Sequence, residues 1–339
     1  MPHPMLFGII LILIAGLMAG DCMLPIKFNR FWQWENTWLV FSIVSLVILP
    51  WLLALIFVDH LFAAYQIVSL WQFAVPVLFG AGWGIAQALF GLSIQRLGLS
   101  LAYAIIVGLG TLLGTLVPLF AQQRAQLSRA ILVDVFLGIA VMVLGIVLST
   151  WAGKRREMAN PVVASGPSSR HYLPAVLLAV LCGLLAPMLN YAFAFGQPIA
   201  LAAEQLGNSP AHAAYAIWPV GLAGGFLPNV AYCIYLLRRN RTTALFRPLR
   251  PDLYWATLMA VLWMGAFALY GMSASYLGTF GTSIGWALFQ IFMIMTATFS
   301  GIFTGEWKGA PRRAIGLLAA GLVCLTAATA LLAMANHVS

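Results

Sequence analysis

The sequence predicts an all-α integral membrane protein with ten transmembrane helices in two inverted five-helix repeats. Of its 339 residues, 63% are hydrophobic and only 7% are charged, and the mean hydropathy is +0.97. Soluble domains have about 45–50% apolar and about 25% charged residues, and so few charges cannot cover a soluble protein of this length. The composition therefore excludes a soluble enzyme, a nucleic-acid-binding domain and a disordered chain.

Each predicted helix is a run of about 20 mostly apolar residues, the length that crosses the hydrocarbon layer of a bilayer. Ten runs meet this condition: 5–24, 37–58, 73–96, 99–120, 131–152, 173–195, 211–237, 253–276, 280–303 and 314–335. Among the charged residues, only Asp21, Arg96 and Asp134 fall inside these runs.

The basic residues alternate between the predicted loops. The first, third, fifth, seventh and ninth loops contain or border 15 of the 17 Lys and Arg, and the fourth loop holds the other two, Arg124 and Arg129. Because cytoplasmic loops carry the excess of basic residues, the odd loops are predicted to be cytoplasmic and both termini outside. We expect a bacterial-type cytoplasmic (inner) membrane, and we assign the basic charge to topology rather than to nucleic-acid binding.

An internal duplication supports the two repeats. A shift of 180 residues aligns 82–98 with 262–278, with eight identities in 17 positions, including Trp83 with Trp263 and Leu97-Gly98 with Leu277-Gly278. Five spans per half give the halves opposite orientations. The predicted domains are therefore a first repeat at 1–152, a cytoplasmic linker at 153–172 and a second repeat at 173–339.

Inverted repeats favour a secondary transporter, because two related halves can open one central site to either side in turn. The sequence has no GxxxxGK[ST] nucleotide-binding loop, and its four Cys and five His show no metal-ligand spacing. We therefore expect no catalytic residue, no metal and no cofactor. An intramembrane enzyme is a rival, but the sequence contains no HExxH motif. A channel is another, but it would leave the duplication unexplained.

Several strings resemble the L-rhamnose–proton symporter family of the drug/metabolite transporter superfamily: LPIKFNRFWQWENTW, IVSLVILPW, FGAGWGI, RLGLS, GTLVP and TGEWKGAPRR. The resemblance covers about residues 13–330. It implies ten helices in two inverted repeats, outside termini and symport of a small neutral sugar with protons. The stretches AQALF (86–90) and WALFQ (286–290), and Asp21, differ from the family pattern. A related deoxy sugar such as L-fucose, or another small polar metabolite, therefore stays open as the substrate.

Asp21 is the candidate proton-coupling residue. It lies four residues before Pro25 inside an apolar span, and an unpaired carboxylate there is costly, so it faces a cavity or is protonated. The other reading is an ion pair with Lys27 or Arg30 at the cytoplasmic interface. Asp134 is a competitor near the outer end of its span.

Seven residues are candidates for substrate binding. The amides of Gln87, Gln290, Asn190 and Asn229 lie within spans and need a partner, which is either a neighbouring helix or a polyol whose hydroxyls donate and accept as amides do. The indoles of Trp83, Trp263 and Trp286 can stack on the apolar face of a sugar, although Trp is also common at membrane interfaces and in packing.

Glycine and proline mark two further helices. Pro219, Gly224-Gly225 and Pro228 predict a local interruption of the seventh span, a usual sign of a transporter's site or hinge. Gly108, Gly110 and Gly114, with Pro118, predict close packing or a gate in the fourth span.

These observations together predict a secondary active transporter that imports a small neutral deoxy sugar, such as L-rhamnose or L-fucose, with protons by alternating access. Its partners are then the sugar, protons and the lipid bilayer. An exporter or exchanger of another small polar metabolite is the alternative, and an intramembrane enzyme is a more distant one.

The predicted topology can be measured with reporter fusions. A fusion at Ser165 is expected to report the cytoplasm and a fusion at the C-terminus the outside, because of the uneven distribution of basic residues. A C-terminal fusion that reports the cytoplasm would contradict the prediction.

Overall fold

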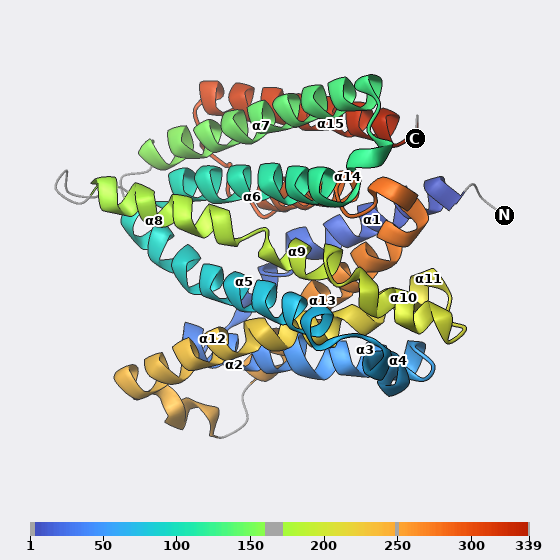
Figure 1. Cartoon of the computed structure of the whole chain (residues 1–339). Coiled ribbons are helices and arrows are strands. Elements are labelled where there is room, and N and C mark those ends of the chain that lie inside the picture. The colour runs from blue at the N-terminus through green and yellow to red at the C-terminus, as the bar shows by residue number, and fades with distance from the viewer. Residues whose placement is uncertain (1–3, 160–171, 248–250, 338–339) are drawn as a thin grey trace. The chain divides into compact units, whose positions relative to one another are not determined.

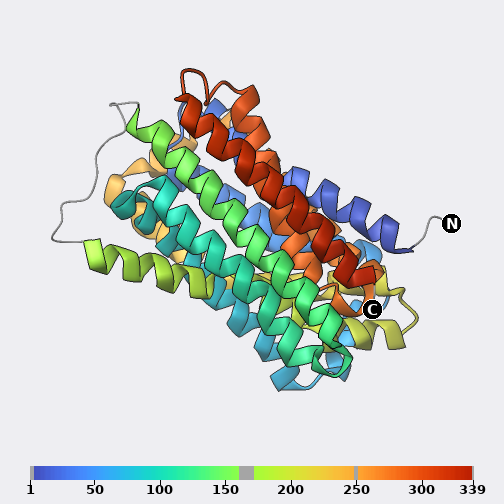
Figure 2. The same cartoon turned by 90° about the horizontal axis from the view of Figure 1, so that it is seen from above.

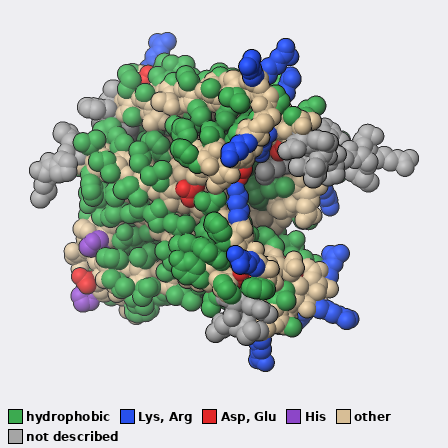
Figure 3. Space-filling model, turned by 180° about the vertical axis from the view of Figure 1, so that it is seen from behind, with side chains coloured by type: hydrophobic (Ala, Val, Ile, Leu, Met, Phe, Trp, Pro, Cys, Tyr) green, Lys and Arg blue, Asp and Glu red, His purple; other side chains and the backbone are tan. Residues whose placement is uncertain are grey.

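The structure is a computed structural model that describes residues 4–159, 172–247 and 251–337. Within these residues ten helical segments are long and apolar enough to cross a membrane: Pro4–Phe28, Trp34–Phe57, Leu70–Leu97, Ser100–Gln122, Arg129–Met158, Leu173–Gln205, Pro210–Asn240, Asp252–Phe280, Ile284–Phe303 and Arg312–Ala335. The prediction of ten spans is confirmed. Figure 3 shows hydrophobic side chains over most of the visible face, as lipid contact requires.

The chain forms two compact units, and each takes segments from both halves of the sequence. Unit 1 comprises Met1–Ala88 and Met188–Gly278, and unit 2 comprises Leu89–Pro187 and Thr279–Ser339. The predicted division at 152 and 173 follows the sequence halves instead and stays a prediction; most of the 153–172 linker lies outside the described residues. In the structure the helix that closes the first half, α7 (Arg129–Met158), continues six residues beyond 152.

The helices of each unit follow in chain order (Figure 1). Unit 1 contains α1 (Pro4–Asp21), η1 (Leu24–Phe28), α2 (Trp34–Ile43), η2 (Val44–Ile48), α3 (Leu49–Phe57), α4 (Leu61–Ile67), the first part of α5 (Leu70–Leu97), α9 (Met188–Ala194), α10 (Gln197–Gln205), α11 (Pro210–Ala213), η6 (Ala214–Ala216), α12 (Ile217–Asn240), η7 (Thr242–Phe246) and α13 (Asp252–Leu277). Unit 2 contains the end of α5, α6 (Leu99–Gln122), η3 (Arg124–Gln126), α7, α8 (Tyr172–Leu185), α14 (Ile284–Phe303) and α15 (Arg312–His337).

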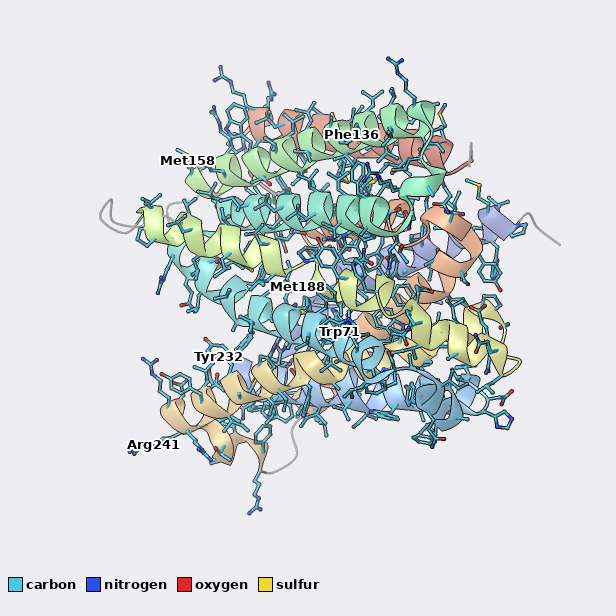
Figure 4. The ribbon with its side chains drawn as sticks, in the orientation of Figure 1. Trp71, Phe136, Met158, Met188, Tyr232 and Arg241 are labelled. Atoms are coloured by element: carbon cyan, nitrogen blue, oxygen red, sulfur yellow. The ribbon has the colours of Figure 1, made fainter. Side chains whose placement is uncertain are left out.

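The interruption predicted at Pro219, Gly224-Gly225 and Pro228 is not found, because α12 is one continuous helix through these residues. The predicted seventh span is irregular just before them, where η6 separates α11 from α12. Pro219 is tolerated because it is the third residue of α12, within the first turn, where backbone N–H groups have no intrahelical partner. A further break lies in the sixth span, which was predicted as a single helix over 173–195. There α8 ends before Ala186-Pro187 and α9 begins at Met188 (labelled in Figure 4), since a proline disfavours helical geometry in the residue before it.

The two helices that carry the sequence duplication end in the same way. α5 ends at Leu97 and is followed by Gly98 with φ 81°, and α13 ends at Leu277 and is followed by Gly278 with φ 73°. Glycine adopts this left-handed conformation without a steric penalty, so each Leu-Gly pair stops a helix and redirects the chain.

Glycines in unit 1 bring the backbones of α5 and α12 into direct contact. A Cβ on Gly80 would clash with the carbonyl oxygen of Gly221, and a Cβ on Gly84 would lie 2.6 Å from that of Gly225. A Cβ on Gly224 would in turn clash with the carbonyl oxygen of Val77 on α5. The glycines predicted to loosen α12 therefore serve close helix packing, which small residues allow in membranes.

In unit 2, α7 and α15 lie side by side along their lengths, as Figures 1 and 2 both show. A Cβ on Gly138 would lie 2.8 Å from Leu332, and one on Gly145 would lie 3.0 Å from the carbonyl oxygen of Gly321. The residue numbers rise along one helix as they fall along the other, so this glycine-mediated contact is antiparallel.

In unit 1, the buried carboxylates of Asp252 and Glu35 connect chain segments that are far apart in the sequence. Asp252, which has no exposed surface, accepts hydrogen bonds from the backbone N–H groups of Arg30, Phe31 and Trp32 at 3.1, 2.8 and 2.7 Å. Glu35 accepts from the side chains of Asn240 and Thr242 at 3.0 and 2.7 Å. These bonds tie the chain between α1 and α2 to the chain between α12 and α13.

The α5–α12 contact predicts a difference between two glycines of α5. Gly80→Val is expected to lower the free energy of unfolding by about 1–3 kcal/mol, the usual effect of overpacking, because the clash is with backbone. Gly91→Val is the matched control, because it changes helix propensity equally but meets nothing within 4 Å. Thermal unfolding of the two purified variants compares them, and equal midpoints would show that the contact adds nothing.

Candidate functional site

The two tryptophans paired by the sequence duplication contact each other directly in unit 1. The indole rings of Trp83 on α5 and Trp263 on α13 stack with their centroids 5.4 Å apart and their planes 24° apart. Both side chains are buried. The rings face each other, so this separation leaves no room for a sugar between them.

Three further rings extend this stack into a continuous aromatic cluster, which we define as Trp38, Phe41, Trp83, Trp263 and Phe267. The ring of Trp263 lies 4.5 Å from Phe267 and 5.8 Å from Phe41, and Phe41 lies 4.8 Å from Trp38. The cluster joins side chains of α2, α5 and α13. Gly225 of α12 makes room for it, because a Cβ there would lie 2.8 Å from the indole of Trp83.

Asn229 reaches the aromatic cluster through a hydrogen bond. Its Oδ1 accepts from Nε1 of Trp38 at 3.1 Å, and its Nδ2 donates to the carbonyl oxygen of Gly225 at 2.9 Å. Both groups of this buried amide are therefore used inside the protein, which is the helix–helix role considered for it from the sequence.

Asn190 lies on the other side of the cluster. Its Oδ1 accepts a 2.5 Å hydrogen bond from the hydroxyl of Tyr270, a fully buried residue of α13. Phe193 joins this pair to Trp218, whose ring it stacks on at 4.9 Å, and Trp218 lies 5.7 Å from Phe267. Nε1 of Trp218 is buried without a hydrogen-bond partner among the described residues.

Gln87 is half-buried one turn after Trp83 on α5. Within the described part of the chain its amide has no hydrogen-bond partner, unlike those of Asn190 and Asn229. Because side chains four residues apart share a helix face, Gln87 is the amide best placed to bind a ligand beside the tryptophan pair.

The two remaining candidates, Trp286 and Gln290, belong to α14 in unit 2. Nε1 of Trp286 donates to the carbonyl oxygen of Gly110, and Nε2 of Gln290 donates to the hydroxyl of Thr111, both at 3.4 Å. Gly114 makes room for the indole, because a Cβ there would clash with it. Gly114 thus serves close packing of α6 against α14.

Asp21 is the last residue of α1. The packing of α1 on α13 shows which part of α13 is level with it. A Cβ on Gly8 would lie 3.1 Å from Leu277, and one on Gly265 would clash with Met18, so the two helices run antiparallel. Three residues beyond Met18, Asp21 is level with Leu262 and Trp263, near the middle of α13. The stack of Phe28 on Trp255, with centroids 4.9 Å apart, fits the same alignment.

The carboxylate of Asp21 has no ion-pair or hydrogen-bond partner among the described residues, and its Oδ1 is buried. The side chain of Asp21 as a whole is half-buried. A carboxyl oxygen that is buried without a hydrogen-bond partner is unfavourable when charged, which keeps Asp21 a candidate for proton coupling.

The sequence did not single out Trp218, Tyr270, Phe41 or Phe267 as members of this network. Tyr270 and Phe267 carried a detectable signal, since they follow Trp263 by seven and four residues and so share its helix face. Trp218 and Phe41 carried none, because their proximity depends on packing between separate helices.

Comparison with known proteins identifies the family. The family model described as L-rhamnose-proton symport protein (RhaT) matches residues 1–336. The chain belongs to this family. Relatives named L-rhamnose-proton symporter include one from Klebsiella pneumoniae subsp. pneumoniae, 29% identical over 96% of each chain, and one from Cronobacter sakazakii, 29% identical over 97% of each. A third, from Escherichia coli O1:K1, is 28% identical over 97% of each.

Membership of this family makes the protein a multi-pass membrane transporter and not an enzyme. The family resemblance predicted from the sequence strings is thus confirmed over nearly the whole chain. The roles of individual residues stay predictions.

Proposed function

We propose that this protein imports a small neutral deoxy sugar together with protons by alternating access, with L-rhamnose as the first candidate substrate. The observation that carries the proposal is the family match over residues 1–336, joined by relatives named L-rhamnose-proton symporter that cover 96–97% of the chain. L-fucose, which is also a neutral deoxy sugar, is the second candidate. The distribution of basic residues supports outside termini and cytoplasmic odd loops.

In this proposal the sugar binds beside Trp83 and Trp263, with Gln87 as a hydrogen-bonding partner. The indoles supply flat apolar surface, and an amide both donates to and accepts from hydroxyls. Because the two indoles stack on each other here, the sugar binds when they separate. Asn190 and Asn229 of unit 1 act as secondary ligands, since each must exchange an existing protein hydrogen bond. Trp286 and Gln290 belong to unit 2 and bond to α6 there.

Asp21 is the proposed proton-coupling residue. Coupling requires that proton and sugar change each other's affinity by the same factor, and Asp21 lies level with one of the proposed sugar-binding tryptophans. Protonation removes its buried charge, which lowers the cost of moving α1 through an apolar environment. The two inverted repeats then exchange conformations around the occupied site.

The tryptophan pair can be tested by equilibrium binding of L-rhamnose. Trp83→Ala and Trp263→Ala are each expected to raise the Kd about tenfold or more, which is ~1.4 kcal/mol of binding free energy. Trp83→Phe and Trp263→Phe accompany them, because removing a buried indole costs roughly 3–5 kcal/mol of stability whereas a phenyl ring fills much of the space.

Trp71→Ala is the matched control for this test, since Trp71 lies on the same helix as Trp83 but is 70% exposed (Figure 4). Its affinity is expected to equal that of the wild type. Folded Ala variants that bind L-rhamnose as the wild type does would show that these residues only pack.

Asp21→Asn mimics the protonated carboxyl, so it is expected to abolish sugar-driven proton uptake while sugar binding and sugar exchange remain. Proteoliposomes loaded with a pH-sensitive dye measure the uptake after L-rhamnose is added. Asp134→Asn, a half-buried carboxyl on α7, is the control and should keep the wild-type ratio of protons to sugar. Proton uptake by Asp21→Asn at that same ratio would place the coupling site elsewhere.

A further inference from the structure

Unit 2 contains a cavity of about 240 Å³, lined by residues outside the candidate site described above. It lies between α6, α7, α14 and α15, beside the chain that joins the last two. Its charged and aromatic lining residues are Tyr103, Arg156, Glu157, Glu306 and Trp307. Figure 4 labels Met158, the last residue of α7, which marks the end of the unit where the cavity lies.

The polar groups of the cavity are arranged in two sets. Oε1 of Glu157 accepts a 2.8 Å hydrogen bond from the hydroxyl of Ser100 on α6. The guanidinium of Arg156 lies 3.4 Å from Oε2 of Glu306 and 4.7 Å from the centroid of the Trp307 ring. Because the Arg156 and Glu306 side chains are 24% and 40% exposed, their ion pair is weak and a ligand can exchange it.

The charges of the cavity disfavour an anion. Two carboxylates and one guanidinium repel an anion, and the guanidinium already has a carboxylate partner. A metal ion is disfavoured too, since the described residues contain no group of three or more His, Cys, Asp or Glu that could hold one. The hydroxyls of Ser100, Ser149, Thr150 and Thr298 also line the cavity.

A neutral polyol matches the groups that line this cavity. Carboxylates accept hydrogen bonds from sugar hydroxyls, the guanidinium donates to them, and the indole offers an apolar face. Ligand pockets for drug-sized molecules measure about 300–1,000 Å³, so a cavity of about 240 Å³ suits a single sugar ring.

We propose that this cavity is a second monosaccharide-binding site, which the sugar occupies as it leaves the protein. The end of unit 2 that holds the cavity also carries Lys154, Arg155, Lys308, Arg312 and Arg313, and the charge distribution predicts that this end is cytoplasmic. The inference rests on the proposed sugar transport, but it concerns residues that are separate from the tryptophan pair.

The test is protection of a cysteine placed in the cavity. Thr298→Cys provides the thiol, and Cys324→Ala removes the half-buried native cysteine; Cys22, Cys182 and Cys233 are buried. The rate of maleimide modification of purified full-length protein is measured with and without L-rhamnose. At ten times the Kd, only about one site in eleven is empty, so the rate is expected to fall roughly tenfold.

Two variants separate the cavity from the tryptophan pair. Glu157→Gln with Glu306→Gln is expected to lose the protection, whereas Asp134→Asn, a carboxyl of α7 outside the cavity, should keep it. Trp83→Ala should lose transport and keep the protection, because the two sites use different residues. Circular dichroism confirms that each variant is folded.

The outcomes for the cavity and for transport can be told apart. Sugar-driven proton uptake without protection overturns the cavity proposal and leaves the proposed function standing. Protection without proton uptake supports the cavity and overturns the proposed function. Protection that persists in the Glu157→Gln, Glu306→Gln variant, or that disappears in Trp83→Ala, also overturns a separate cavity site.

Discussion

The contact between the backbones of α5 and α12 is the constraint on which the rest of unit 1 depends. In lipid, apolar helices gain little from the hydrophobic effect, so close van der Waals approach between small residues has to hold them together. The glycines at 80, 84, 221, 224 and 225 permit that approach. One of them, Gly225, also accommodates the indole of Trp83 and accepts a hydrogen bond from Asn229. The same contact therefore fixes the packing, the tryptophan pair and the amide network.

Several polar groups in the apolar interior are satisfied by other parts of the chain. Asp252 accepts three backbone N–H groups, Glu35 accepts two side chains, and Asn190 and Asn229 bond to aromatic residues. Six residues among those described have a buried side-chain atom without a hydrogen-bond partner: Asp21, Asn29, Asn36, Ser42, Ser149 and Trp218. Asp21 is the one of these six whose atom belongs to a carboxyl group. An unsatisfied buried polar atom lowers stability, and a proton can remove this cost at a carboxyl group, which is the structural reason to propose Asp21 as the coupling residue.

The two units use the same packing device for different purposes. Glycines in unit 1 bring together helices that carry aromatic and amide side chains, whereas those of α7 and α15 in unit 2 lie against leucines, Ser149 and each other's backbone. Gly114 of α6 also belongs to unit 2, but like the glycines of unit 1 it accommodates an aromatic side chain, the indole of Trp286. The division between the units falls soon after the middle of α5 in the first half and at the end of α13 in the second. Each half thus contributes to both units.

The sequence by itself determined the helical class, the ten spans and the family, because apolar length, basic flanks and aromatic strings are local properties of the chain. It also identified Trp83 with Trp263 as a related pair and Asp21 as an unusual carboxylate. Only the tertiary structure decided that the two indoles stack on each other, that Asn229 bonds to Trp38, and that Asp21 lies level with Trp263. It also placed the helix breaks at η6, before α12, and at Ala186-Pro187 rather than at the glycines of α12. Glycine and proline in a sequence show where a helix can bend or pack closely, but the choice between the two depends on whether another backbone occupies the space, and that neighbour comes from a distant part of the chain.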